Sequence, residues 1–207
     1  MPELSRALSI SRSAFLELKE ELRLVKDGYE FLDEKLILIA AEMLRQRESY
    51  REARLRLDAL CRSSAELLRD AVADQGLDGL QVYPASELVD AQLRTTARPF
   101  VGLVMLDSAL ELGEQQSTYK ALRPTPEVRQ CRESFRRILQ ASAEIAALSA
   151  NLRRLTHEYR RTERRVRALE NVVLPEIHGD LAAMEEHLDL MDQEEVIRVR
   201  TVRKQAL

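Results

Sequence analysis

Side chains that could carry out chemistry are few and scattered in this chain. Its 207 residues include only three histidines and two cysteines. His178 and His187 are nine residues apart, which on a helix places them on opposite faces, so they could not share a metal ion. No glycine is followed by lysine, which excludes a phosphate-binding P-loop. We find no nucleophile paired with a base, and therefore predict no catalytic residue, no cofactor and no metal site.

The two cysteines do not suggest chemistry either. Neither Cys61 nor Cys131 has a histidine nearby in the sequence, and two cysteines do not make a disulfide framework. We expect both to pack as small apolar side chains in a reducing, cytoplasmic setting.

The densest charged segment is RRTERRVRALENVVLPEI, residues 160–177, which combines arginines, an apolar stripe and one proline. Two interpretations stay open. The arginines are either a solvated helix face, partly paired with acids such as Glu163 and Glu170, or a surface for acidic groups of a partner. Nucleic acid is disfavoured, because no aromatic platform accompanies the arginines and the net charge is −3.

The composition indicates which elements carry these residues. Charged residues make up 32% of the chain and aromatic residues only 4%, with no tryptophan, which is typical of long helices or a coiled coil. No segment approaches about 18 consecutive apolar residues, so we predict no direct membrane insertion. The N-terminal residues do not have the layout of a signal peptide.

A first long helix is predicted over residues 11–75, beginning near Ser11 or Ser13 and ending at Gly76. Its apolar residues alternate steps of three and four, as in a coiled coil: Phe15, Leu18, Leu22, Val25, Tyr29, Leu32, Leu36, Ile39 and Met43. A second stripe, Leu24, Phe31 and Leu38, predicts contact with more than one partner.

Residues 76–124 interrupt the pattern with four of the six glycines and three of the six prolines. Two short stretches, 89–96 and 100–106, have the residue types of strands and flank Ala97-Arg98-Pro99. We predict an insert that contains a small β-hairpin.

A second helix is predicted over residues 125–205, because Thr125-Pro126-Glu127 is a strong helix start. Near Pro175 the apolar spacing changes to three consecutive steps of four, which predicts a phase shift and a kink. The apolar face is formed by Phe135, Ile138, Ile145, Leu148, Leu152, Leu155, Tyr159, Val166, Leu169, Val173, Ile177, Leu181, Met184, Leu188 and Met191.

The predicted fold class is therefore dominated by α-helix: a long antiparallel two-helix left-handed coiled coil with a small irregular or β-hairpin insert between the helices. Pairing Val72 with Glu127 brings Leu18 close to Met184. The last residues of the second helix, including Val202, would then have no partner within the chain.

The segment TERRVRALENVVLPEI (162–177), followed by QEEVIRVRTVRK (193–204), resembles the C-terminal signature of the D subunit of V-type and A-type rotary ATPases. The N-terminal SRSAFLELKEEL and the TPEV at Thr125 agree with that family. Arg167 departs from it, because the family usually has asparagine there, and so do residues 34–37 and 196–199.

The resemblance implies a non-catalytic central rotor subunit that transmits torque between the catalytic hexamer and an ion-translocating ring. It implies the catalytic A and B subunits, the F subunit and the C subunit (called d in eukaryotes) as partners, in a complex peripheral to the plasma membrane on its cytoplasmic side. The implied contact residues are Arg160, Arg161, Arg164, Arg165, Val166, Leu169, Glu170, Val173 and Pro175 in the shaft, with Arg198, Arg200 and Arg203 at a C-terminal tip in the head.

Three alternatives stay open at this point. A stand-alone coiled-coil scaffold or tether would form a stable homodimer. A membrane-curving helical dimer would need a basic face on both helices, whereas the first helix is rich in acids between Glu17 and Glu34. The gamma subunit of F-type machines has similar mechanics, but the C-terminal signature argues against it.

Overall fold

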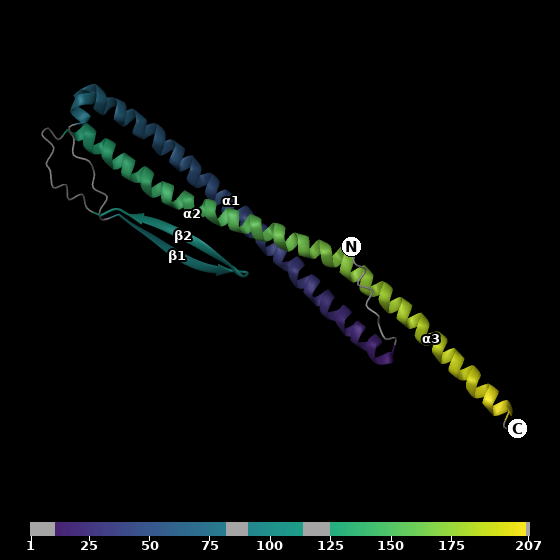
Figure 1. The fold of residues 1–207 in the computed structure, drawn as a ribbon. Helices are drawn as coiled ribbons and strands as arrows, with labels where there is room; N and C mark the ends of the chain where they lie inside the picture. Colours follow the sequence, from purple (N-terminus) through teal and green to yellow (C-terminus); the bar gives the residue numbers. More distant parts are fainter. Residues whose placement is uncertain (1–10, 82–90, 114–124, 206–207) are drawn as a thin grey trace. The chain divides into compact units, whose positions relative to one another are not determined.

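The computed structural model describes residues 11–81, 91–113 and 125–205. In chain order, the elements are α1 (Arg12–Gln81), β1 (Gln92–Phe100), β2 (Leu103–Glu111), α2 (Pro126–Ala168), a π-helical turn η1 (Leu169–Val173) and α3 (Leu174–Gln205) (Figure 1). This confirms the predicted fold class, with two long helical stretches and a small antiparallel hairpin between them. The chain divides into two compact units: its two ends (Met1–Ile37 with Arg160–Leu207), and Leu38–Tyr159.

Helix α1 begins with a serine cap, because the hydroxyl of Ser11 accepts a hydrogen bond from the Ala14 N–H at 3.1 Å. The predicted end of this helix at Gly76 is instead a break. Gly76 has φ 71° and ψ 165°, and residues 77–81 are helical again. Glycine adopts a positive φ at little cost, and Leu80 packs against the buried cluster of Ala71, Val128 and Cys131, which gives the final turn an apolar anchor.

The unit Leu38–Tyr159 has two buried clusters. One contains Ile39, Met105 and Leu155, and therefore joins α1, β2 and α2; the other is the Ala71 cluster. Cys131 is buried, as predicted, and its burial raises the pKa of the thiol. Cys61 is exposed, so the prediction that it packs is wrong. It does not lie on the face of α1 whose side chains, such as Ala53 and Ser64, are buried.

The hairpin was predicted correctly, but its turn was not. Strand β1 pairs with β2 from Gln92↔Glu111 to Phe100↔Leu103, so residues 97–99 lie within β1. The turn is formed by Val101 (φ 44°) and Gly102 (φ 82°), and two positive φ values suit the right-handed twist of a two-residue hairpin. A β-branched residue rarely adopts a positive φ, so Val101 gives no sign of a turn, and Gly102 is the one residue of a turn-forming type here. Pro99 is tolerated because each strand of a two-stranded sheet has one free edge.

The unit of the chain ends is held by α1 packing against α3. Leu18, Ile177, Leu181 and Met184 form its buried cluster, so the predicted proximity of Leu18 and Met184 is confirmed. Arg12 and Asp192 add an ion pair, in which Nη2 of Arg12 lies 2.7 and 2.8 Å from the two carboxylate oxygens.

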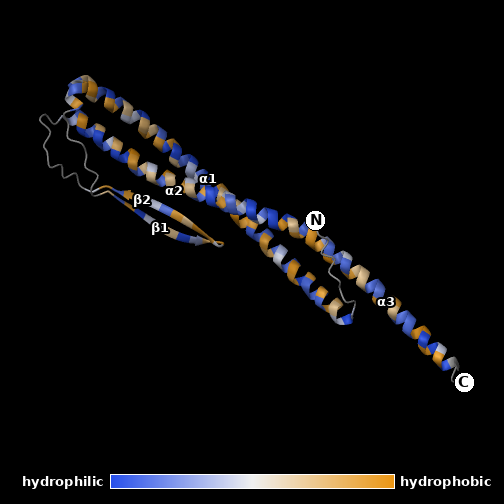
Figure 2. Cartoon of the chain, in the orientation of Figure 1, coloured by the Kyte–Doolittle hydropathy of each residue, from blue (hydrophilic) through white to orange (hydrophobic). Residues whose placement is uncertain are grey.

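From residue 189 onward the described side chains of α3 are exposed, including Met191 at 51% and Val202 at 60%. Met191 and Phe135 (42% exposed) are thus outside the core predicted for them. Along each helix, apolar residues recur between polar ones (Figure 2). None of the helices in the described ranges carries an apolar stretch that could span a bilayer.

Candidate subunit interface

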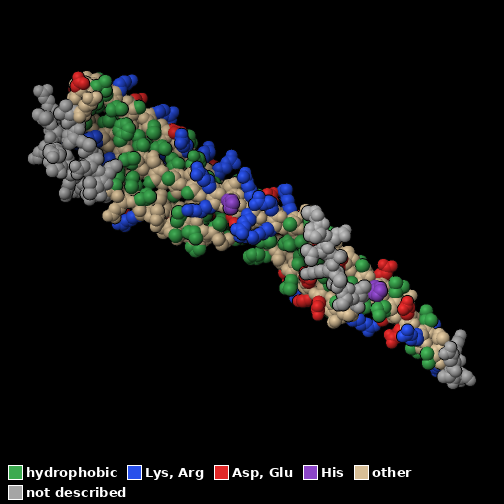
Figure 3. All heavy atoms as spheres, viewed as in Figure 1, with side chains coloured by type: hydrophobic (Ala, Val, Ile, Leu, Met, Phe, Trp, Pro, Cys, Tyr) green, Lys and Arg blue, Asp and Glu red, His purple; other side chains and the backbone are tan. Residues whose placement is uncertain are grey.

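Four arginines of α2, here called the arginine face, extend into solvent: Arg160, Arg161, Arg164 and Arg165. Within the described part of the chain, none of them has an ion pair. The nearby Glu163 pairs with Arg167 at 2.7 Å instead. The arginine face contains two i,i+4 pairs of like charge, each of which costs a few tenths of a kcal/mol in an isolated helix. Basic side chains also prevail over acidic ones on part of the visible surface (Figure 3).

The apolar residues of the same segment point inward. Val166 is 6% exposed, and Leu169 and Val173 are half-buried. Val173 packs against the Leu18 cluster. These three side chains are therefore engaged within the chain, whereas the arginine face is exposed.

Glu170 and Pro175 are exposed. Glu170 lies close enough to α1 for its carboxylate, together with partial burial and Asp33, to raise the pKa of Tyr29. Like the arginine face, both side chains are accessible to another molecule.

The predicted irregularity near Pro175 takes the form of the π-helical turn η1. The Leu174 N–H donates to the Leu169 carbonyl, five residues back. Pro175 has no N–H to donate to the carbonyl of Asn171, four residues back. The side-chain amide of Asn171 donates to the Arg167 carbonyl at 3.0 Å. Sequence reasoning missed Asn171, although an asparagine side chain within a helix can bond to the carbonyl four residues back.

The C-terminal part of α3 is basic and apolar at once. Arg198, Arg200 and Arg203 are exposed. The intervening apolar residues Val196, Ile197, Val199 and Val202 are also exposed, at 50%, 63%, 61% and 60%. Neighbouring exposed apolar side chains on one helix are typical of interaction surfaces.

The hairpin is joined to α2 by a ladder of hydrogen bonds that sequence reasoning missed. Every second residue from Val104 to Leu112 bonds to a residue of α2. Successive partners on α2 are three to eight residues apart. These hydrogen bonds extend over about 27 Å of helix at 1.5 Å per residue and about 27 Å of strand at 3.4 Å per residue. The helix and the strand therefore run alongside each other over equal lengths. The rungs join Val104 to Arg154, Leu106 to Asn151, Ser108 to Ala143, Leu110 to Gln140, and Leu112 to Arg136.

The strongest rung is Asn151, which is fully buried. Its Oδ1 accepts from the Leu106 N–H at 2.8 Å, and its Nδ2 donates to the Leu106 carbonyl at 2.8 Å. The side-chain amide thus replaces a neighbouring strand at the β2 edge, which would otherwise be open to other chains.

A buried carboxylate fixes β1 to α1. Glu42 is 6% exposed and accepts hydrogen bonds from Arg45 at 2.8 Å, from Gln46 at 3.0 Å and from Arg98 at 3.0 Å. Burial alone would favour the neutral acid, but the hydrogen bonds from Gln46, Arg45 and Arg98 outweigh it, so the pKa of Glu42 lies below its ordinary value.

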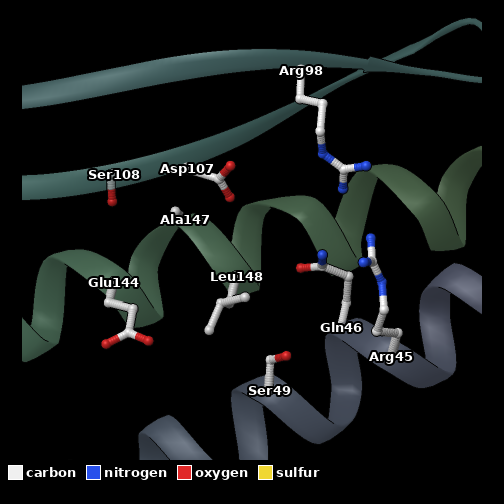
Figure 4. Close-up of a pocket in the computed structure, with 9 residues that line it drawn as sticks. All are labelled: Arg45, Gln46, Ser49, Arg98, Asp107, Ser108, Glu144, Ala147 and Leu148. Carbon is white, nitrogen blue, oxygen red and sulfur yellow. The ribbon is translucent and has the colours of Figure 1, made fainter.

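A pocket of about 480 Å³ lies between the hairpin, α1 and α2 (Figure 4). Its polar lining mixes both signs of charge: Arg45 and Arg98 lie toward one end, and Asp107 and Glu144 lie away from them. The arginines already share Glu42, and Glu144 pairs with Arg56 at 2.8 Å. The pocket contains no pairing of a nucleophile with a base, and the described residues contain no group of His, Cys, Asp and Glu that could hold a metal ion.

Comparison with known proteins agrees with this geometry. The sequence model of the ATP synthase D-subunit family matches residues 14–204. The D subunit of the V-type ATP synthase of Thermotoga neapolitana is 23% identical over 194 residues, covering 94% of this chain and 96% of the relative. The D subunit of the A-type ATP synthase of Pyrococcus abyssi is 27% identical over 206 residues, covering 98% and 96%. The resemblance of residues 162–177 and 193–204 is thereby confirmed, and the chain belongs to the family of ATP synthase D subunits.

Proposed function

We propose that this chain acts as the shaft of its rotary ATPase without catalysing a reaction itself. As a member of the D-subunit family, it is a central stalk subunit of a V-type or A-type ATP synthase, and a stand-alone scaffold or tether is not favoured. The observation that supports the shaft best is the antiparallel helix pairing found in each of the two units, with a buried cluster in each. Two helices locked side by side resist twisting better than one helix, and transmitting torque requires that resistance.

We assign the contacts with the catalytic head to the C-terminal tip and the arginine face. The tip combines Arg198, Arg200 and Arg203 with exposed valine and isoleucine side chains, so it suits a bore lined with apolar and acidic groups. The catalytic A and B subunits would supply that bore. The unpaired charge of the arginine face would attract acidic side chains of these subunits or of the F subunit, an attraction that salt weakens.

We assign a further contact to the second apolar stripe of α1. Leu24 and Phe31 are 64% and 65% exposed, and Gly28 lies between them with no atom within 4 Å of the place that a Cβ would occupy. A seam of this spacing accepts the apolar face of a partner helix. The F subunit would bind this seam, and the C subunit would seat the chain above the membrane ring. The complex would then be peripheral to the cytoplasmic face of the plasma membrane.

Reconstitution tests this function. The chain would be co-expressed with candidate A, B and F subunits, purified as a complex, and compared with the hexamer alone in steady-state ATP hydrolysis. We expect co-purification and multi-cycle turnover that depends on the chain. A hexamer whose turnover is indifferent to the chain would contradict the shaft role.

Two matched variants separate the proposed contacts. Replacing the four residues of the arginine face by glutamine should weaken binding most at low salt. Replacing Arg12 by glutamine breaks only the surface pair with Asp192 and should leave binding unchanged. Light scattering of the isolated chain addresses the scaffold alternative, since a shaft subunit should be a folded monomer and a scaffold a stable homodimer.

A further inference from the structure

The second helical stretch contains one residue more than a continuous coiled-coil register allows. Steps of four, three and four separate Thr162, Val166, Leu169 and Val173, and the same steps separate Ile177, Leu181, Met184 and Leu188. Strict alternation requires a step of three between the two series, but Val173 and Ile177 are four apart. The second series is therefore displaced by one residue.

The π-helical turn η1 accommodates this surplus residue. A turn closed by i→i+5 bonds holds about one residue more than a turn closed by i→i+4 bonds, and the Leu174 N–H bonds to the Leu169 carbonyl in this way. Both series can then face α1, and Val166 and Ile177 are indeed only 6% and 5% exposed.

Few contacts hold the turn in place. No residue between Val166 and Ile177 is buried, and neither is any residue of α1 between 19 and 37, which belongs to the same unit. Val172, within the turn, is 59% exposed. The amide of Asn171 supports one carbonyl, and Pro175 cannot support another.

We propose that, when this unit is twisted about its long axis, the second helical stretch changes conformation first at η1. If the surplus turn passes into regular α-helix, every residue beyond it rotates by about 100° around the helix axis. In that state Ile177, Leu181 and Met184 leave the α1 face. The buried cluster therefore opposes the rotation, while the thinly packed turn permits it. This inference concerns the isolated chain and does not depend on the proposed function.

Two variants separate the surplus residue from the proline itself. Deleting Pro175 leaves a continuous register of alternating steps. Pro175→Ala restores the missing N–H but keeps the residue count, so the π turn should persist. Deleting Ala183, an exposed residue between Leu181 and Met184, is the matched control, because it removes one residue where no surplus exists.

The test measures amide hydrogen exchange across residues 167–176 and the thermal midpoint of the full chain. For the Pro175 deletion we expect at least tenfold slower exchange in this segment and an unchanged or higher midpoint. For Pro175→Ala we expect less than a threefold change in exchange, and for the Ala183 deletion a lower midpoint. A Pro175 deletion as destabilising as the Ala183 deletion would overturn the surplus-residue account. Equal slowing in Pro175→Ala would show that the proline alone loosens the helix, and would also overturn it.

Discussion

Replacing Asn151 by alanine should open the contact between β2 and α2 at Leu106 without unfolding the helices. Asn151 is fully buried and supplies both partners of the Leu106 backbone, at 2.8 Å each. Alanine is itself a good helix former, so α2 gains slightly in intrinsic propensity. The loss therefore falls on the contact between strand and helix.

The magnitude follows from the two groups left unpaired. Each buried backbone group that loses its partner costs about 1–3 kcal/mol, which gives about 2–4 kcal/mol when water reaches one group in part. Met105, which is 1% exposed, and the Arg98–Glu42 pair at 3.0 Å still hold the hairpin. They limit the loss to local opening.

Hydrogen exchange of the Leu106 amide is the direct assay, combined with urea denaturation followed by circular dichroism. A loss of about 2–4 kcal/mol corresponds to exchange faster by about 30-fold to 700-fold, at 1.4 kcal/mol per factor of ten. The helical unfolding midpoint should change much less than the local exchange rate, because the helix pairs do not depend on this rung.

Gln140→Ala provides the matched control. Gln140 also reaches the β2 edge, but through one exposed hydrogen bond of 3.4 Å to the Leu110 carbonyl, so its removal should cost less than about 0.5 kcal/mol. If Leu106 exchanges equally fast in both variants, or if Asn151→Ala leaves its rate unchanged, the claim that Asn151 replaces a neighbouring strand is refuted.

Two further predictions concern charge and backbone conformation. The pKa of Glu42 is lowered in the folded state, so the carboxylate's stabilising contribution is fully present above the ordinary glutamate pKa and is lost as pH falls through the lowered value. In Glu42→Gln, the free energy of unfolding should therefore fall less steeply as the pH is lowered. An unchanged decrease would argue against the bonding of Glu42 to Arg45, Gln46 and Arg98. Gly76 has φ 71° and ψ 165°, a conformation essentially restricted to glycine, so Gly76→Ala should destabilise the chain by about 1–3 kcal/mol in a thermal melt. Gly28 is helical with open space around it, so Gly28→Ala should stabilise the chain by about 0.5–1 kcal/mol. Two changes of the same sign would contradict these backbone assignments.

Sequence periodicity was sufficient to predict the helix pairing. The three-four alternation predicted the proximity of Leu18 and Met184, and these residues share a buried cluster. In a heptad pattern many apolar positions favour the same pairing register, so a single exception such as Phe135 does not change that register. The steps of four near Pro175 also predicted an irregularity, because the number of residues between apolar positions directly limits the type of turn.

The hairpin and its attachment depend on information that no local pattern contains. Val101 at a positive φ has no sequence signature, so the turn was expected earlier in the strand. The bonds of Asn151 and Glu42 join residues 45 and 56 positions away. Their partners are identified only when strand and helix lie side by side. For the arginine face, periodicity showed that the charges are adjacent, but the pairing of Glu163 with Arg167 required side-chain geometry.

The central claim is that this chain turns inside a catalytic hexamer. Its most direct test is to immobilise the reconstituted A/B hexamer, attach a bead to Cys61, whose thiol is exposed, and record the bead while ATP is supplied. The account predicts rotation in one direction that stops when ATP is withdrawn. A bead that stays fixed or fluctuates without direction, on a hexamer that is hydrolysing ATP and holds the chain, would contradict it.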